Sequence, residues 1–457
     1  MAERYRTMTF DDLPLHLILE ILSCGRLSAV DLVSLELSSK MFRGSQACHP
    51  LMFRSLVDLA ASQVCESHPV YRPMSLGLKE ELFERCQGNW TRMLRFLQMV
   101  EQSSSIVENS SGNMQVTTGK YHTLLLRDSA VYSLQISASH NHAAFVMQSG
   151  EVFTWGDNSS YCCGHREPAR VIPRPRLVEA LKDIPCDQVA SGLSFTVFLT
   201  RKGQVYTCGS NTCGQLGHGD SLERPVPKVI EQFDTAGPVV QVAAGPSYAL
   251  AVMENGLLYS FGSGSNFCLG HGEHHNEFQP RMIQSFRRRG IHVVRVSAGD
   301  EHVVALDSNG QVYTWGKGYC GALGHGDEID KVVPELVENL KSHLAVQVCA
   351  RKRKTFVLIE HGYVFGFGWM AFGSLGFPDR AASDKVLRPR ILDSLRTHCI
   401  SQISTGLYHT VVITNKGRMF GFGDNERAQL GHDMLRACLE PTEIFVQQTL
   451  DQASAVP

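Results

Sequence analysis

Alternating hydrophobic and polar positions recur along most of this chain. In Gln311–Trp315, apolar and aromatic residues alternate with polar ones, which is the pattern of a strand with one buried face. The dipeptide Asn309-Gly310 precedes it, and both residue types accept the positive φ of a tight hairpin turn. Upstream of the turn lies an apolar strand, Val296–Leu306, and downstream lies a glycine-rich loop. The pattern predicts consecutive short β-strands joined by tight turns.

The same unit returns every 52 to 55 residues. Each copy carries two glycines, one in the hairpin turn and one after the strand that follows it. The hairpin glycines are Gly150, Gly203, Gly256, Gly310, Gly362 and Gly417. The glycines after the strand are Gly156, Gly209, Gly262, Gly316, Gly368 and Gly423. Two markers with one period indicate a repeat protein, and about four short strands per copy are typical of a β-propeller blade rather than a helical solenoid.

These repeats resemble the regulator-of-chromosome-condensation family, whose members form seven-bladed propellers. Six copies are clear, and several contain a Leu-Gly-His-Gly loop. This loop begins at Leu216, Leu269 and Leu323. A seventh copy is partial, because Thr118–Leu124 repeats a first strand and Ala130–Ser133 a second, with no loop after them. The resemblance implies a mainly β fold in which residues 113–457 form a seven-bladed propeller, and Pro441–Val446 is expected to supply the missing outer strand and close the ring.

The N-terminal region follows a helical period instead. Its apolar positions at helical spacing are Leu13, Leu17, Ile18, Ile21 and Leu22. Asp11 and Asp12 stand where the start of a helix favours acidic side chains. Ser28 is predicted to cap a second helix, and Ser38 or Ser39 to open a third. Three helices this short cannot bury enough apolar surface to be stable alone, so part of it is expected to contact other helices or a partner.

Residues 8–45 resemble an F-box, the motif that binds the Skp-family adaptor of cullin-based ubiquitin ligases. The resemblance rests on Leu13-Pro14, on the leucine-rich first helix Leu17–Leu22, and on the order of residues from Asp31 to Arg43. The alternative is an ordinary N-terminal helical bundle. If the F-box interpretation holds, the adaptor is bound by Leu13, Pro14, Leu17, Ile18, Ile21, Leu22, Leu32 and Leu35.

Three features depart from the F-box pattern. His16 stands in place of a common acid, Ser28 in place of a common proline, and Cys24-Gly25 is an insertion before Leu27. These departures concern the strength of adaptor binding more than the identity of the motif.

Residues 46–112 are expected to form a helical linker and a polar joint. An apolar stripe at helical spacing runs from Leu78 to Val100, with a break at Gly88-Asn89. Its simplest interpretation is a packing face that fixes the F-box relative to the propeller. The polar segment Ser103–Gly112 then leads into the first blade.

Composition narrows the classes of function. The net charge is −2 and charged residues make up 19% of the chain, so we expect neither nucleic-acid nor membrane binding. Relatives that bind chromatin use a basic tail, and this sequence shows none. The 14 cysteines are scattered without a C-x-x-C pair, which suits a reducing compartment, so we expect a protein of the cytoplasm, the nucleus or both. Polar residues interrupt Leu13–Leu22, which argues against a signal sequence.

Candidate chemistry is scarce. The loop histidines occur once per repeat, at His218, His271, His325 and His432. A ring would hold them apart rather than converge them on one metal ion, and we expect their ring nitrogens to bond nearby backbone. Gly262–Gly270 resembles a phosphate loop only in its glycine content and opens no helix. No Ser, His and Asp trio stands out, so we expect no catalytic site, metal or cofactor.

One repeat departs from the others in charge. Its first strand runs into Arg351, Lys352, Arg353 and Lys354, and Arg351 stands where other copies have Gly245 and Gly299. Repeat symmetry places these four cations at the end of a strand on one rim of the ring. They form either a solvated turn or a binding site for an acidic or phosphorylated protein, since clustered arginines suit bidentate anion contacts. A nuclear import signal is disfavoured because the segment is expected to be folded.

Together the two resemblances imply the substrate-recognition subunit of a Skp-cullin-F-box ubiquitin ligase. Such a receptor catalyses nothing itself and works by holding a substrate near the ligase. Its partners are the Skp-family adaptor, the cullin scaffold and a substrate protein. The alternative is a guanine-nucleotide exchange factor for a small GTPase, the activity of one member of the repeat family, which rests on fold analogy.

A third interpretation, the ultraviolet-B photoreceptor of a plant branch of the repeat family, is disfavoured. That branch needs a dense tryptophan cluster, and this chain has four tryptophans. Where the branch repeats Gly-Trp-Arg-His-Thr, this chain reads Gly-Lys-Tyr-His-Thr at Gly119 and Gly-Leu-Tyr-His-Thr at Gly406.

Overall fold

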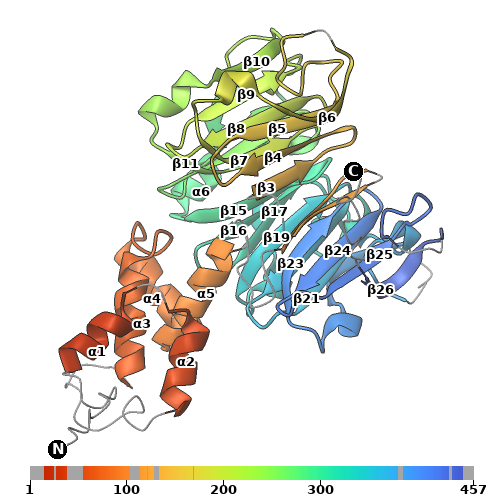
Figure 1. The fold of residues 1–457 in the computed structure, drawn as a ribbon. Helices are drawn as coiled ribbons and strands as arrows, with labels where there is room; N and C mark the ends of the chain where they lie inside the picture. Colours follow the sequence, from red (N-terminus) through yellow and green to blue (C-terminus); the bar gives the residue numbers. More distant parts are fainter. Residues whose placement is uncertain are drawn as a thin grey trace, which may run out of the picture. The chain divides into compact units, whose positions relative to one another are not determined.

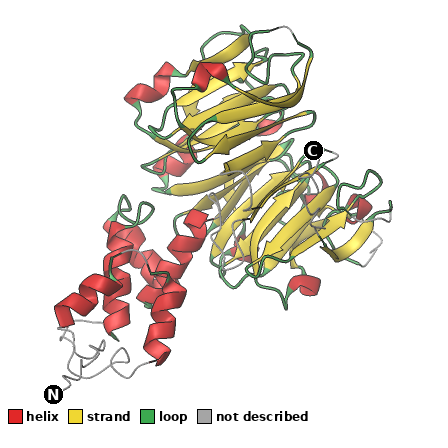
Figure 2. Cartoon of the chain, viewed as in Figure 1, coloured by secondary structure: helices red, strands yellow, loops and turns green. Residues whose placement is uncertain are grey.

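The structure is a computed structural model, which divides the chain into two compact units, Met1–Ser104 and Ser105–Pro457. Helices make up the described part of the first unit, and strands dominate the second (Figures 1 and 2). None of the helices in the described ranges is long and apolar enough to cross a membrane. The described residues are 15–24, 27–38, 55–102, 114–120, 122–127, 133–167, 169–378, 384–431 and 435–445.

The first unit is a small helical bundle. Its described helices are α1 Leu15–Leu22, α2 Ala29–Ser38, α3 Leu56–Ser67, α4 Leu76–Arg85 and α5 Trp90–Gln102. The helix α5 contacts both α2 and α3, and Leu94, Leu97 and Val100 on it are fully buried. The break between α4 and α5 confirms the one predicted at Gly88-Asn89. The predicted third F-box helix at Phe42 lies outside the described residues.

The start of α2 explains why that helix forms where it does. The hydroxyl of Ser28 accepts a hydrogen bond from the N–H of Asp31 at 3.2 Å, and the carboxylate of Asp31 accepts one from the N–H of Ser28 at 2.8 Å. These reciprocal bonds satisfy donors that the first turn leaves free. The predicted cap at Ser28 is confirmed.

The second unit is built from antiparallel sheets in which consecutive strands are neighbours. The strands of the first three four-stranded sheets are β3 Ser133–Ala138, β4 His142–Met147, β5 Val152–Asp157, β6 Val171–Leu177; β7 Cys186–Ser191, β8 Phe195–Thr200, β9 Val205–Gly209, β10 Arg224–Val229; β11 Val239–Ala244, β12 Tyr248–Met253, β13 Leu258–Gly262 and β14 Glu277–Met282. A short helix, α6 Gln284–Arg288, follows β14.

Three further sheets have the same order. Their strands are β15 Val293–Ala298, β16 His302–Asp307, β17 Val312–Gly316, β18 Lys331–Leu336; β19 Ala345–Arg351, β20 Lys354–Ile359, β21 Val364–Trp369, β22 Lys385–Ile391; β23 Ile400–Thr405, β24 His409–Thr414, β25 Met419–Gly423 and β26 Cys438–Ile444. The first strand of each sheet contacts its counterpart in the next, so these strands form the inner wall of the ring. The segment Val296–Leu306, expected as one strand, is two strands joined by a turn that begins at Gly299, where the polar residues Asp300 and Glu301 interrupt the apolar positions.

The expectation of seven blades is wrong. The described residues form six four-stranded blades and one two-stranded sheet, made of β1 Met114–Thr118 and β2 Thr123–Arg127. Only five residues separate β2 from β3, which is too few for two more strands of blade length. The predicted closure by Pro441–Val446 is wrong as well, because β26 pairs with β25 inside its own blade. Instead β1 lies between β23 and β3 and so joins the ends of the ring (Figure 1).

A repeated glutamine ties the inner strands together. Its side-chain carbonyl accepts a hydrogen bond from a backbone N–H in the first strand of the next sheet. These bonds join Gln115 to Ile136 (3.1 Å), Gln135 to Val189 (2.8 Å), Gln188 to Val242 (2.9 Å), Gln241 to Val296 (2.8 Å) and Gln347 to Ile403 (3.0 Å). At the same place in β23, Oε1 of Gln402 is buried and has no hydrogen-bond partner among the described residues.

Candidate functional site

Two helices of the first unit keep apolar side chains at their surface. On α1, Leu17 is 38% exposed and Ile21 is 42% exposed, and their spacing of four residues places them on one face. On α2, Val30 is 60% exposed and Val33 is 39% exposed, three residues apart. Each helix therefore presents an apolar pair that its own unit does not cover.

The predicted adaptor-binding residues fall into three groups. Ile18, Leu22 and Leu32 are buried inside the bundle, and Leu35 is half-buried. Leu17 and Ile21 are exposed, and Leu13 and Pro14 lie outside the described residues. The buried group holds the helices together, so the predicted contact residues that α1 leaves available to a partner, among its described side chains, are Leu17 and Ile21. Adaptor binding itself stays a prediction.

In the propeller, the turn between the first and second strands follows a pairing rule. Most of these turns begin with glycine, and their fourth residue is a ring that lies against it. A methyl group added to the glycine would stand 2.0 Å from the ring for Gly192 and Phe195, 2.1 Å for Gly245 and Tyr248, and 2.5 Å for Gly299 and His302. In these three turns the ring leaves no room for a side chain at the first position. Ser139 departs from the rule, and its hydroxyl lies within hydrogen-bond distance of Nδ1 of His142, at 2.9 Å.

The turn Arg351–Lys354 breaks this rule at both of its ends. Arg351 replaces the glycine, and Lys354 replaces the ring, so no ring meets the arginine side chain. Arg351 is 8% exposed, and its guanidinium lies 3.9 Å from the carboxylate of Asp300. The acid comes from the matching turn one repeat earlier and offsets the charge of the arginine.

Lys354 is completely buried, and its Nζ donates to the carbonyl of His409 in the next sheet at 3.4 Å. Burial lowers the pKa of Lys354 from 10.5 to about 7. In an earlier repeat, the hydroxyl of Tyr248 donates to the carbonyl of His302 at 3.0 Å. Lys354 thus keeps the inter-sheet hydrogen bond that a tyrosine makes at the same position.

Lys352 and Arg353 are held by neighbouring side chains. The ammonium of Lys352 lies 4.2 Å from the ring centre of Trp369 and 3.9 Å from that of Tyr408, which is a cation–π arrangement. The guanidinium of Arg353 donates to Glu301 at 3.0 Å and lies 4.8 Å from the ring centre of Tyr319. Neither side chain is a free cation.

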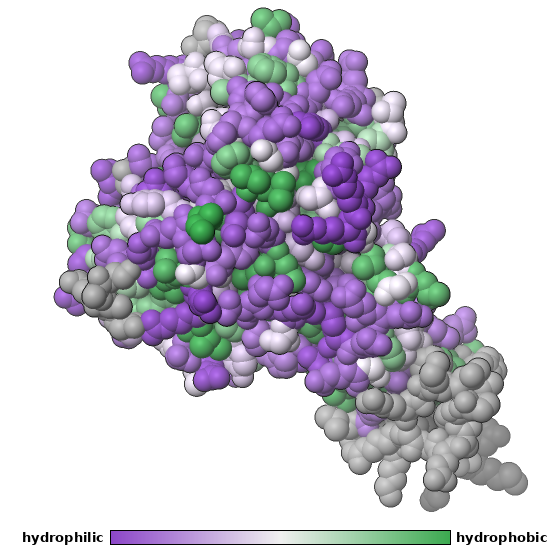
Figure 3. Space-filling model, turned by 180° about the vertical axis from the view of Figure 1, so that it is seen from behind, coloured by the Kyte–Doolittle hydropathy of each residue, from purple (hydrophilic) through white to green (hydrophobic). Residues whose placement is uncertain are grey.

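The four predicted substrate-binding cations therefore do not form an exposed basic run, since two are buried and two are paired. What surrounds them is an aromatic-basic surface, which we define as Tyr319, Lys352, Arg353, Trp369, Phe372 and Tyr408. Its most exposed members are Tyr319, at 50%, and Phe372, at 49%. On the face of the molecule drawn in Figure 3, apolar side chains gather in small groups among hydrophilic ones. Substrate binding by this surface stays a prediction.

The repeat spacing in the sequence could have predicted part of these contacts, although the run of four charges by itself could not. Glu301 and Arg353 are 52 residues apart, and so are Asp300 and Lys352, so side-by-side residues are one repeat apart. Aligning the turn at Gly299 with the turn at Arg351 predicts the pairing of acids with cations. It does not predict the aromatic neighbours Trp369 and Tyr408, which come from a strand end and from the following turn.

The loop histidines are structural. The Nε2 atoms of His218, His271 and His325 lie 3.0, 2.9 and 3.0 Å from the hydroxyls of Thr207, Ser260 and Thr314. The expected backbone partner is thus a side-chain hydroxyl on the adjacent strand, and His432 lies outside the described residues. Burial lowers the pKa of His218 and His271 to about 4, so both are neutral at physiological pH. No group of metal-ligating side chains occurs in the described ranges.

Comparison with known proteins agrees with this architecture. The sequence profile of the regulator of chromosome condensation (RCC1) repeat matches residues 149–199, 202–252, 255–306, 309–358 and 361–413. The chain is 34% identical over 299 residues to the ultraviolet-B receptor UVR8 of Arabidopsis thaliana, a match that covers 65% of this chain and 66% of the receptor. It is 32% identical over 286 residues to the E3 ubiquitin-protein ligase HERC2 of Homo sapiens, covering 62% of this chain and 6% of the ligase. The chain thus spans slightly less than two thirds of the first relative and a small part of the second.

Solved structures show the same fold at lower identity. Human WBSCR16 has a TM-score of 0.63 and 22% identity, with 71% of this chain and 84% of that chain covered. Prp20p of Saccharomyces cerevisiae has a TM-score of 0.64 and 18% identity, with 77% and 90% covered. These likenesses concern the fold alone.

Proposed function

Because the chain belongs to the regulator of chromosome condensation repeat family, we propose that its propeller binds a protein substrate and that its N-terminal helices join it to a ubiquitin ligase. In this role the chain is a non-catalytic receptor. It acts by proximity, since a tethered substrate meets the ligase at a high effective concentration. Similarity to a segment of the E3 ubiquitin-protein ligase HERC2 supports a place in the same pathway.

The observation that carries this proposal is the pair of exposed apolar side chains on each of the helices α1 and α2. A helical bundle has no reason of its own to expose Leu17, Ile21, Val30 and Val33 after burying Ile18, Leu22 and Leu32. Apolar residues at i and i+4 on one helix suit a partner that buries that face. Both pairs lie in the segment that resembles an F-box, and a Skp-family adaptor is the partner that this resemblance implies.

The aromatic-basic surface is the proposed substrate site on the propeller. Exposed aromatic side chains contribute strongly to protein interfaces, and here Tyr319 and Phe372 are each about half exposed beside paired cations. A partner with an acidic group would compete with Glu301 for Arg353, whereas an apolar partner would cover the two rings. The surface therefore suits a peptide that combines an apolar side chain with an acidic or phosphorylated one.

Adaptor capture by the full chain tests the proposal. Purified chain is mixed with a purified Skp-family adaptor, and the wild type is compared with Leu17→Asp/Ile21→Asp. Placing two carboxylates in an apolar contact is expected to lower the affinity at least about a hundredfold. Both side chains are exposed, so the fold is expected to remain, as checked by circular dichroism.

The matched control is Leu222→Asp, which places a carboxylate on a propeller side chain that is 63% exposed. It is expected to bind the adaptor as the wild type does. If the wild-type chain captures no Skp-family adaptor, the receptor proposal fails. Capture of a nucleotide-free small GTPase in that case would favour the exchange-factor alternative.

A further inference from the structure

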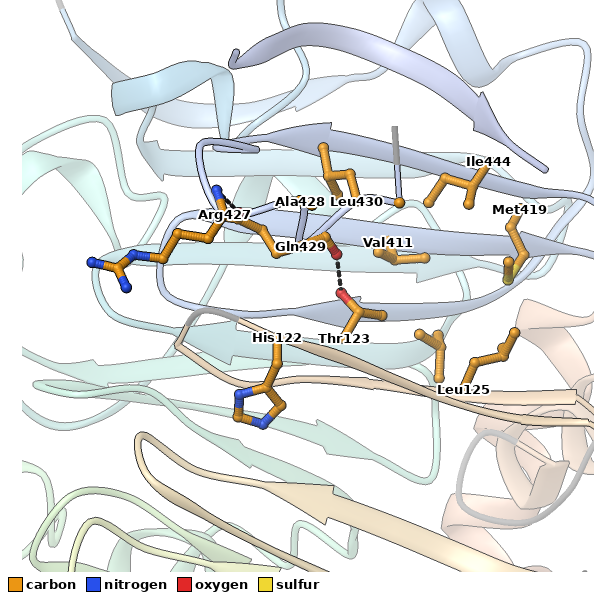
Figure 4. Close-up of a pocket in the computed structure, with 12 residues that line it drawn as sticks. His122, Thr123, Leu125, Val411, Met419, Arg427, Ala428, Gln429, Leu430 and Ile444 are labelled. Atoms are coloured by element: carbon orange, nitrogen blue, oxygen red, sulfur yellow. Dashed lines mark hydrogen bonds between the residues drawn. The ribbon is translucent and has the colours of Figure 1, made fainter. Parts of the chain in front are cut away.

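A cavity and a group of exposed rings both present apolar side chains in the propeller. The cavity has a volume of about 340 Å³ and lies at the seam, where β1–β2 meets the last blade (Figure 4). Its walls include Val116, Val411 and Leu430, which belong to the core cluster that joins these two sheets. The construction of the ring therefore accounts for the cavity. The rings belong to the aromatic-basic surface, and the repeat does not account for them.

Three rings of this surface occupy positions where the other four-stranded blades carry none. They are Trp369, Phe372 and Tyr408, and we call them the aromatic cage. The other blades have Asp157, Ser210, Ser263, Lys317 and Asp424 in place of Trp369, Ser160, Cys213, Asn266, Cys320 and Arg427 in place of Phe372, and Asn141, Ser194, Ser247, Glu301 and Arg353 in place of Tyr408. A blade of this repeat thus forms without any of the three rings, yet all three occur together here.

The three rings lie close together at steep angles. The ring centre of Trp369 is 6.3 Å from that of Phe372, at 90°, and 6.3 Å from that of Tyr408, at 63°. The ring centres of Phe372 and Tyr408 are 5.5 Å apart, at 83°. The ammonium of Lys352 lies 4.2 Å from the centre of Trp369 and 3.9 Å from that of Tyr408. Aromatic rings grouped around a cation in this way are how proteins recognise quaternary ammonium groups.

The backbone at Phe372 has a conformation that an aromatic residue rarely adopts. Its φ is 59°, in the left-handed region. The loop imposes this conformation, since Asn266 and Cys320 have φ values of 57° and 62° at the matching positions. A bulky side chain is unfavourable there, and burial does not offset the cost because Phe372 is about half exposed. Strained residues of this kind are typical of binding sites.

The charges around the cage leave Lys352 as its cation. Arg351 lies beside Asp300, and Arg353 donates to Glu301. Burial lowers the pKa of Lys354 to about 7, so that amine is partly neutral at this pH. Among the described residues, no carboxylate pairs with the ammonium of Lys352, which contacts the two rings instead. A partner's cation that replaced Lys352 would therefore leave the charge inside the cage unchanged.

A primary ammonium is a poor occupant of such a cage. It carries three N–H donors, and no acceptor in the described part of the chain lies within hydrogen-bond distance of the ammonium of Lys352. A primary ammonium is also strongly hydrated and loses this hydration between the rings. A trimethylammonium group has the same charge, has no N–H donor and is larger and less hydrated, so the rings favour it over Lys352.

We propose that the aromatic cage binds a methylated lysine side chain of the substrate protein, and that Lys352 occupies the cage in the free chain and leaves it when the substrate binds. This inference rests on the proposed function, in which the aromatic-basic surface is the substrate site. The displaced ammonium of Lys352 then becomes available to an acidic group of the same substrate. The cage and the cations beside it thus recognise two parts of one peptide.

Peptide binding to the full chain tests this proposal by fluorescence anisotropy. The probe is a fluorescein-labelled peptide, Gly-Glu-Gly-Lys-Gly-Leu-Gly, whose lysine is unmodified, trimethylated or replaced by the neutral carbon isostere of trimethyllysine. The trimethylated peptide is expected to bind about tenfold or more tightly than either of the others, because only it combines the charge with weak hydration. Trp369→Leu and Tyr408→Leu keep an apolar side chain but remove a ring, and each is expected to lose about tenfold in affinity for this peptide.

Lys352→Asn tests the exchange of cations. Lys352 has a φ of 53°, which asparagine accepts, and the shorter side chain does not reach the rings. The empty cage is expected to bind the trimethylated peptide about threefold or more tightly than the wild type does. The matched control is Tyr363→Leu, which removes the ring from another cation–π pair, 5.8 Å from the guanidinium of Arg396, and is expected to bind as the wild type does.

The outcomes that overturn the proposal are distinct. Equal binding of the neutral isostere would reduce the cage to an apolar contact, and failure of the trimethylated peptide to bind rejects it outright. Unchanged affinity of Lys352→Asn rejects the exchange of cations. Free choline that binds as tightly as the trimethylated peptide would assign the cage to a small molecule and reject the protein partner. Adaptor capture is measured on the same wild-type chain, so adaptor binding without peptide binding rejects the cage alone, and the reverse rejects the receptor role alone.

Discussion

Two kinds of interface join neighbouring sheets of the propeller, and they differ in how many strands of each sheet make contacts. Between β11–β14 and β15–β18, hydrogen bonds occur at three levels. On the inner strands, Gln241 accepts the N–H of Val296, and the hydroxyl of Tyr248 donates to the carbonyl of His302. Further out, the indole N–H of Trp315 donates to the loop carbonyl of Cys268 at 2.9 Å. Between the last blade and β1–β2, His409 and Thr123 keep a ring-to-hydroxyl contact at 3.0 Å. Among the described residues, the glutamine bond and the third-strand contact are missing there. A sheet of two inner strands can therefore take its place in the ring, but the contacts between neighbouring blades that lie further out require a third strand.

The largest expected effect is on the free energy of unfolding and concerns Lys354, whose buried amine lies at an interface between two four-stranded blades. Between pH 7 and 10.5, the unfolded chain holds a proton on Lys354 that the folded chain gives up, because burial lowers its pKa to about 7. The free energy of unfolding is therefore expected to rise as the pH rises through this window, by roughly 3–5 kcal/mol in total. Lys354→Met is expected to raise stability at pH 7 and to remove most of this dependence, measured by urea unfolding at pH 7, 8 and 9.5.

A methionine in this place leaves no acceptor unpaired, since the carbonyl of His409 also accepts the N–H of Gly406 at 2.9 Å. Lys416→Met on the surface is the matched control and is expected to change neither the stability at pH 7 nor its pH dependence. Parallel pH profiles for the wild type and Lys354→Met would show that Lys354 is charged in the folded chain.

A smaller effect is expected from the glutamines. Gln241→Ala removes the bond that its Oε1 accepts from the N–H of Val296 and the bond that its Nε2 donates to the Val296 carbonyl at 2.9 Å, which leaves a buried N–H unpaired. We expect a loss of roughly 1–3 kcal/mol in the free energy of unfolding. Gln402→Ala at the seam is expected to cost less than about 1 kcal/mol because its Oε1 has no partner in the described part of the ring. Equal losses in denaturant unfolding would contradict the distinction between the two interfaces.

The smallest effect separates two loop glycines, Gly217 and Gly431, each tested in the full chain. Both have positive φ, 76° at Gly217 and 68° at Gly431, so alanine strains the backbone by roughly 1 kcal/mol in either place. At Gly217 the new methyl group also crowds Phe261 at 3.0 Å, which is expected to add about 1 kcal/mol or more. Thermal unfolding of the two alanine variants measures the difference. A Gly431→Ala variant as unstable as Gly217→Ala would contradict the distinction between the two interfaces.

Most of the propeller was predictable from the sequence because its period is carried by turn glycines, and these residues determine where a strand ends. The number of blades was not predictable in the same way. Residues Thr118–Leu124 match the repeat well, yet pattern matching counts copies and does not count how many strands each copy contains. The limit is one of chain length, since the five residues between Arg127 and Ser133 cannot form two more strands.

The sequence predicted where the candidate sites lie, but it did not predict which of their side chains are buried or paired. The helical spacing of Leu17 and Ile21 indicated an apolar surface on the first helix, and both side chains are exposed. The same spacing could not separate them from Ile18 and Leu22, because burial depends on where the neighbouring helices lie. At Arg351–Lys354 the sequence showed four charges in a row, whereas their acids and aromatic rings come from other repeats.

The pairing of glycine and ring in the inner turns has a consequence for how these repeats can change over time. A large side chain at Gly299 would collide with the ring of His302, so that substitution is closed as long as the ring is present. Replacing the ring first opens the way, and the glycine can then be lost. In Arg351 and Lys354 both positions of the turn differ from the glycine and the ring, and this combination avoids the collision. The size of the residue that the first position tolerates therefore depends on which residue stands at the fourth.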